Sequence, residues 1–128
     1  MSENPNQKHY DLEERTRHFA KRTRTFVTQV PKTSGNFEDG RQLVRASGSV
    51  GANYIEANES LSKKDFVMRV KIARKEAKES RYWLSLVDCG ENKALEAECQ
   101  KLIREATELM MILSSIMRKS EGSGGHTS

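Results

Sequence analysis

Histidines and cysteines are the side chains here that could catalyse a reaction or hold a metal, and they are few. The histidines are His9, His18 and His126, and the cysteines are Cys89 and Cys99. No histidine follows a glutamate by three residues, as in di-iron helical bundles, and zinc needs more cysteine or histidine ligands than these. Cys89 would end one helix and Cys99 would lie about two turns into the next, so we predict reduced thiols. We expect no enzyme, cofactor or metal site.

Two pairs of glutamates are also candidates for acid–base chemistry. Glu56 and Glu59 stand three residues apart, as do Glu76 and Glu79. Carboxylates at this spacing share one face of a helix, where they usually bond arginines of a neighbouring helix. We therefore predict structural ion pairs, with partners among Arg41, Arg45 and Arg69.

A one-sided row of cations between residues 62 and 86 is the strongest chemical signal. On a helical wheel its lysines fall within one narrow arc, with arginines beside them and no acid between. A solvated helix usually mixes charges to gain ion pairs, whereas a stripe of one sign suits an anionic partner such as a phosphate backbone. A merely solvated face is the other interpretation, and the tyrosine of the stripe would stack on a base or simply pack. The predicted nucleic-acid-binding residues are Lys64, Lys71, Arg74, Lys75, Lys78, Arg81 and Tyr82, with Lys63 beside them.

A second flank of the same segment suggests self-association. Ile72 and Trp83 are apolar but lie off the expected core stripe, and Arg69 and Glu76 lie where they could pair across an interface. An apolar face wider than one core needs indicates a contact surface, although Trp83 could equally belong to the core. The predicted oligomer-interface residues are Ser47, Gly51, Tyr54, Arg69, Ile72, Glu76 and Trp83.

Helical periodicity shows which elements must position these residues. Apolar residues recur every three or four positions, and Ser62 and Asn92 are predicted helix caps. Asn36 or Ser34 is the predicted cap of the second helix. Pro31 would end the first helix and Gly90 the third. The pattern predicts helices over residues 11–30, 37–58, 62–89 and 92–119. Short connections between amphipathic helices indicate an all-α, antiparallel up-down-up-down four-helix bundle. Residues 1–10 and 120–128 would be flexible.

The second predicted helix has an inward face rich in small residues. Each glycine inside a helix costs about 1 kcal/mol relative to alanine, so a compensating gain is expected. The spacing of Ser47 and Gly51 would let a neighbouring helix approach closely. A phosphate-binding loop is the alternative, but the segment matches neither nucleotide-binding glycine motif and follows no strand. The predicted inward residues are Phe37, Gly40, Leu43, Val44, Ser47, Val50, Gly51, Tyr54 and Ile55.

The composition agrees with long, solvated helices. The chain has 128 residues, of which 35% are hydrophobic and 31% charged, enough for one domain with a modest core. The formal charge of +4 and the pI of about 9.2 modestly favour an acidic partner. The beginning of the sequence lacks the apolar region of a signal peptide, and no run is apolar enough to span a membrane. We expect a cytoplasmic protein without a membrane partner.

Three segments carry a resemblance to a known family. They are GSVGANYIEANE at residues 48–59, SKKDF at 62–66 and RKEAKESRYWL at 74–84. The chain closely resembles, from about Tyr10 to Met117, the bacterial four-helix-bundle family of 23S ribosomal RNA intervening-sequence proteins. That family is similar to the accessory variability protein of diversity-generating retroelements, a basic pentameric bundle that engages reverse transcriptase and nucleic acid.

The resemblance implies a four-helix bundle that assembles into a cyclic homo-oligomer, with a homopentamer as the expected state. It implies a role with nucleic acid and lends no catalytic residue. It implies that GANYIEA, at residues 51–57 of the first segment, and the whole third segment are packing and subunit-contact surfaces. The leading hypothesis is a non-enzymatic homo-oligomer that binds RNA or DNA through the basic face. The alternatives are an adaptor for an acidic protein partner, such as a reverse transcriptase, and a passenger of mobile or ribosomal RNA elements.

Overall fold

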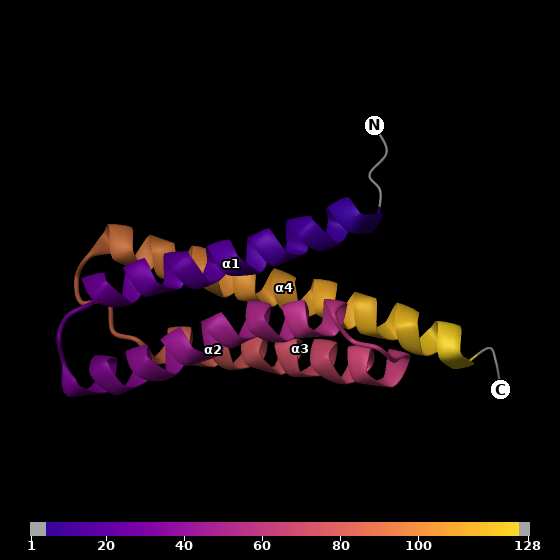
Figure 1. The fold of residues 1–128 in the computed structure, drawn as a ribbon. Helices are drawn as coiled ribbons and strands as arrows, with labels where there is room; N and C mark the ends of the chain where they lie inside the picture. The colour runs from indigo at the N-terminus through magenta and orange to yellow at the C-terminus, as the bar shows by residue number, and fades with distance from the viewer. Residues whose placement is uncertain (1–4, 126–128) are drawn as a thin grey trace.

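The chain forms four long helices in a computed structural model, which describes the backbone of residues 5–125 and the side chains of residues 11–122. The helices are α1 (Pro5–Gln29), α2 (Ser34–Asn58), α3 (Lys63–Leu86) and α4 (Lys93–Gly125). The described residues contain no strand, which confirms the all-α prediction (Figure 1).

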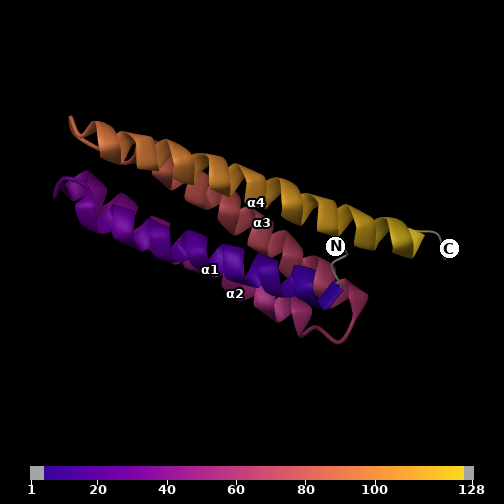
Figure 2. The same cartoon turned by 90° about the horizontal axis from the view of Figure 1, so that it is seen from above.

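Consecutive helices run in opposite directions, and the loops alternate between the two ends of the molecule (Figures 1 and 2). α1 packs beside α2 and α4, and α3 packs beside the same two helices. Within the described residues, neither α1 and α3 nor α2 and α4 pack side by side, so the helices occupy the corners of a square. The face formed by α1 and α2 therefore lies opposite the face formed by α3 and α4.

Two predicted caps begin helices as expected. The Asp65 amide donates to the Ser62 Oγ at 3.1 Å, and the Leu95 amide donates to the Asn92 Oδ1 at 3.0 Å. Each bond satisfies one of the amides that the first turn of a helix leaves without a partner. These caps fix where α3, with its basic stripe, and α4 begin.

The start of α2 differs from the prediction. Thr33 caps it, accepting a hydrogen bond from the Asn36 amide at 3.1 Å. Asn36, one of the two residues predicted as the cap, is buried instead. Its Nδ2 donates to the carbonyls of Pro31 and Asp88 at 2.9 and 2.8 Å, and its Oδ1 accepts from the Asp88 amide at 2.9 Å. Asn36 thereby joins the α1–α2 loop to the α3–α4 loop.

The helix ends also differ from the prediction. α1 begins at Pro5, before the expected residue 11, and α4 continues to Gly125, beyond the expected residue 119. α3 ends at Leu86, so Gly90 is a loop residue with a φ of +67° rather than the helix terminator. Flexibility of the two ends stays a prediction, of which residues 1–4 and 126–128 lie outside the described residues.

The core is one continuous cluster along the bundle axis, and all four helices contribute to it. On α4 the apolar residues that recur every three or four positions form a seam that is buried from Leu95 to Leu113, and the next of them, Ile116, is half-buried. On α2, Gly51 lies against Thr16 and Gly40 against Val27, both on α1. Close approach between helices of one chain therefore accounts for these glycines.

The predicted inward face of α2 was too wide. Phe37 and Ile55 lie on the surface, with 66% and 45% of their area exposed, and Val44 is half-buried. Ser47, Gly51 and Tyr54, predicted as subunit contacts, are instead buried inside the single chain. The apolar surface left outside the core therefore lies at other positions of α2.

Candidate nucleic-acid interface

The basic stripe predicted on residues 62–86 lies on the outer face of α3. Lys64, Lys71, Lys75 and Lys78 are exposed, and 57% of Tyr82 is exposed. The core positions Val70, Ala73, Ala77, Ser80 and Leu84 turn the other side of α3 inward. The periodicity that buries these residues is what brings the lysines to one side of the helix.

Two arginines at the edge of the stripe reach across to α4. The Arg74 Nη1 donates to the Ser114 Oγ at 3.5 Å, and the Arg81 Nη1 donates to the Thr107 Oγ1 at 3.3 Å. Both partners are neutral hydroxyls, so the guanidinium charges are not cancelled. These bonds hold the arginines over the seam between α3 and α4, beside the lysines.

Carboxylates border the stripe on one side. The Lys75 Nζ lies 3.8 Å from Glu79, which also pairs with Arg45 of α2 at 3.2 Å. Lys64, Lys71 and Lys78 form no ion pair with any side chain that the structure describes. Most of the positive charge of α3 is therefore unpaired, and the acids lie on its α2 side.

A hollow of about 560 Å³ runs along the seam between α3 and α4. Its wall combines cations with sulfur-containing and aliphatic side chains. Met68, at the edge of the hollow, is 53% exposed, and Met111 of α4 is 65% exposed. The other residues lining the hollow are Lys71, Ile72, Arg74, Lys75, Lys78, Met110 and Ser114.

Sequence reasoning missed two cations on α4. Arg104 and Arg118 are exposed and stand seven residues before and after Met111, hence on its side of the helix. This side also carries the hydroxyls that Arg74 and Arg81 contact. The seven-residue spacing of Arg104, Met111 and Arg118 could have shown from the sequence that the two arginines share one side of the helix, away from the apolar seam. The basic face is defined hereafter as the α3 stripe together with these two arginines.

The remaining predicted interface residues are mostly engaged within the chain. Glu76 is only 9% exposed and lies 3.5 Å from Arg45, and Arg69 donates to Asn53 at 3.2 Å. Ile72 is half-buried, and Trp83 packs against the core. The Glu76 and Glu79 pairs with Arg45 confirm the expected structural role of that glutamate pair.

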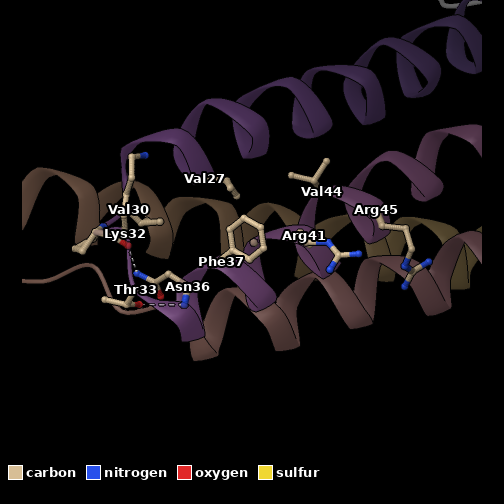
Figure 3. Close-up of a pocket in the computed structure, with 11 residues that line it drawn as sticks. Val27, Val30, Lys32, Thr33, Asn36, Phe37, Arg41, Val44 and Arg45 are labelled. Atoms are coloured by element: carbon tan, nitrogen blue, oxygen red, sulfur yellow. Dashed lines mark hydrogen bonds between the residues drawn. The ribbon is translucent and has the colours of Figure 1, made fainter.

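An apolar groove marks the opposite side of the molecule, between α1 and α2 (Figure 3). It has a volume of about 640 Å³, and its apolar wall includes Val27, Phe37 and Val44. Arg41 and Arg45 project from α2 at its rim, as Figure 3 shows. Further along the same two helices a second hollow reaches the exposed Ile55. The two hollows together are called the α1/α2 groove below.

The cysteines lie closer together than the sequence indicated. Cys89 and Cys99 are both buried free thiols, and they are near enough for each to affect the pKa of the other. The Cys99 Sγ also donates to the Leu84 carbonyl at 3.4 Å. Burial, and then the neighbouring Cys89, raise the pKa of Cys99 to about 12, so both thiols stay protonated at neutral pH.

The described part of the chain contains no cluster of three or more potential metal ligands. None of its helices is both long and apolar enough to cross a membrane.

No curated protein matches the sequence. A crystal structure of a protein of unknown function from the S23 ribosomal protein family of Bacteroides thetaiotaomicron is similar, with 28% identity and a TM-score of 0.71. The similarity covers 82% of this chain and 96% of that one. Residues 8–115 match the family described as 23S rRNA-intervening sequence protein. The chain therefore belongs to the 23S rRNA-intervening sequence protein family.

Proposed function

We propose that this protein is a non-enzymatic homo-oligomer that binds RNA or DNA through its basic face. The observation that carries the proposal is the row of exposed lysines on α3, which has no ionic partner among the described side chains apart from the contact of Lys75 with Glu79. Cations held side by side repel one another, and a phosphate backbone removes that repulsion on binding.

The geometry of the face supports contact with a polyanion rather than with a small anion. The stripe from Lys64 to Lys78 spans about 21 Å at 1.5 Å per residue. Arg74 and Arg81 widen it toward α4, where Arg104 and Arg118 are also exposed. A long surface with many separate cations suits several successive phosphates. Affinity would be mostly electrostatic and would fall steeply with rising salt, because the counterions that binding releases gain less entropy in a more concentrated salt solution.

Self-association is proposed through the α1/α2 groove. Phe37, Val44 and Ile55 are exposed or half-buried and follow heptad-like spacing along α2, with the small residues Gly48 and Ala52 between them. A helix of a second copy would fill such a seam. The groove lies opposite the basic face, so assembly leaves the cations accessible. Several copies of a weak patch would raise the avidity for a long polyanion.

Fluorescence anisotropy with a labelled, structured RNA tests the binding role. Wild-type protein is compared with the Lys71/Lys75/Lys78→Glu variant at about 50 and 200 mM salt. We expect wild-type binding that weakens at least tenfold at the higher salt and a variant that does not bind. Light scattering on both proteins separates loss of phosphate contact from loss of assembly.

A matched control changes the same number of exposed lysines elsewhere. The Lys21/Lys101/Lys119→Glu variant carries the same net charge, but its changes lie on α1 and α4. Because Lys21 also lines the α1/α2 groove, light scattering must show that this variant assembles like the wild type. It should retain most of the affinity. Binding that is insensitive to salt, or that survives reversal on α3, would overturn the proposal. Equal loss in both variants would also do so, because net charge alone would then explain the binding.

A further inference from the structure

We infer that the basic face takes single-stranded nucleic acid, with an unpaired base stacked on the ring of Tyr82. This inference rests on the function proposed above and adds the class of nucleic acid that the face accepts. The observation behind it is that Tyr82, Met68 and Met111 are exposed among the cations of this face.

Tyr82 continues the line of the lysines. It follows Lys78 by four residues, or about 6 Å along α3, and lies on the same side. Its ring meets the Trp83 ring in a T-shaped contact, with centroids 5.1 Å apart and planes at 70°. This contact orients the Tyr82 ring, while 57% of the residue stays exposed. A fixed, open aromatic ring beside phosphate-binding cations is the arrangement that stacks bases in single-strand binders.

Other exposed apolar side chains surround the same cations. Met68 is 53% exposed at the hollow that Lys71, Lys75 and Lys78 also line, and Met111 is 65% exposed across the seam. A face that served only solvation or phosphate contact would gain nothing from exposing these groups to water. Thioethers make favourable contacts with aromatic rings, including the faces of unpaired bases.

A double helix fits this face poorly. The basic face spans α3 and its neighbour α4, so α3 could not bring this face into a groove without α4. Two adjacent helices present a surface about 20 Å across, given helix diameters of about 10 Å. The major groove of DNA is about 12 Å wide, and that of RNA is too narrow for side chains to read. The bases of a duplex are also stacked on one another, so Tyr82 could not reach their faces.

The test measures anisotropy with three probes of one sequence: a labelled single-stranded RNA, the same strand as DNA, and its blunt duplex. The variants are Tyr82→Ala, Tyr82→Phe and Lys71/Lys75/Lys78→Gln, with Leu86→Ala as an exposed apolar control one turn from Tyr82. Circular dichroism and light scattering confirm that each variant is folded and assembled like the wild type. Each affinity is measured over a range of salt concentrations.

We expect one or both single strands to bind tighter than the duplex. Tyr82→Ala should weaken single-strand binding at least about fivefold, the effect of losing one base stack, without changing the slope of affinity against salt. Tyr82→Phe and Leu86→Ala should bind like the wild type. The lysine variant should lower that slope by roughly 2, since each lost phosphate contact on a single strand contributes about 0.7.

Equal or tighter duplex binding would overturn the inference, and so would a Tyr82→Ala variant that binds single strands like the wild type. In both cases loss of binding in the lysine variant would leave the proposed function standing. Absence of binding to all three probes at low salt would overturn the proposed function itself. The two failures are therefore distinguishable.

Discussion

Gly51 of α2 lies so close to Thr16 of α1 that a β-carbon at position 51 would stand 2.8 Å from the Thr16 Oγ1 and 3.2 Å from its Cβ. Thr16 cannot move away easily, because it is 1% exposed and its Oγ1 donates to the Glu13 carbonyl at 2.9 Å. The glycine therefore sets the distance between α1 and α2 at the middle of the bundle.

Gly51→Ala should destabilise the protein by roughly 1–2 kcal/mol. Overpacking costs about 1–3 kcal/mol, and the better helix propensity of alanine offsets up to about 1 kcal/mol of this. Gly48→Ala is the matched control, since its β-carbon would meet only the Arg24 Nη2 at an ordinary 3.7 Å. That variant should be neutral or slightly more stable. Urea unfolding followed by circular dichroism compares them, and equal stability of the two variants would contradict the packing argument.

Periodicity predicted the fold because it reports which residues avoid water. The seam from Leu95 to Leu113 on α4 and the lysines of α3 fall where helical spacing places them. Caps were predictable for the same local reason, since Ser62 and Asn92 bond amides only three residues away. Predictions that depend only on residues close together in the chain were therefore confirmed.

Contacts between distant residues were not predictable. Asn36 looked like a cap, but its partner Asp88 lies 52 positions further along the chain. Phe37 looked like core, because periodicity cannot tell how much of an apolar face one monomer covers. For the same reason we predicted that Gly51 lies at a subunit contact, whereas it packs against Thr16 of the same chain. Only the three-dimensional arrangement shows which helix meets each side of α2.

Asn36→Ala should lower the free energy of unfolding by roughly 2–3 kcal/mol. The change removes three hydrogen bonds and leaves the Pro31 carbonyl and both backbone groups of Asp88 without this partner. Ser34→Ala, at the exposed first residue of α2, should change stability by less than about 0.5 kcal/mol. Chemical unfolding measures both. A loss for Asn36→Ala no larger than that of the control would contradict a role in joining the loops.

Ion pairs should contribute measurably to the contact between α1 and α4. Arg15 donates to both carboxylate oxygens of Glu105 at 2.7 and 2.8 Å, and these bonds raise the pKa of its guanidinium. A double-mutant cycle on this pair should give a coupling of about 1 kcal/mol that shrinks in high salt. The single-contact pair of Arg17 and Glu14, at 3.5 Å and well exposed, should give almost none. Similar coupling energies in the two cycles would show that the geometry is unimportant.

Stability should fall in alkaline solution because the protein buries a thiol and a phenol group that lose their protons at high pH. Burial raises the pKa of Cys99 from 9.0 to about 12, and burial also raises the pKa of Tyr54. Between about pH 9 and pH 12 the unfolded chain releases the Cys99 proton while the folded chain keeps it. The free energy of unfolding therefore decreases as the pH rises. This stabilisation is complete below about pH 9 and is lost toward pH 12.

The Cys99→Ala variant isolates that contribution. Its free energy of unfolding should depend less steeply on pH above about 9 than that of the wild type, by up to about 1.4 kcal/mol per pH unit. Because burial also raises the pKa of Tyr54, the free energy of unfolding should still depend on pH in both proteins. Urea titrations at a series of pH values give the two slopes. Identical slopes would mean that Cys99 titrates alike in the folded and unfolded chains.

Assembly through the α1/α2 groove predicts that charge on α2 separates the subunits. Phe37→Glu and Ile55→Glu place carboxylates at positions that are 66% and 45% exposed in the monomer, so helix content should be kept. Light scattering should show an oligomer for the wild type and smaller species for both variants. Leu61→Glu, at a fully exposed loop position, should behave like the wild type. A monomeric wild type would refute self-association, whereas an oligomer that persists in both variants would place the contact on another face.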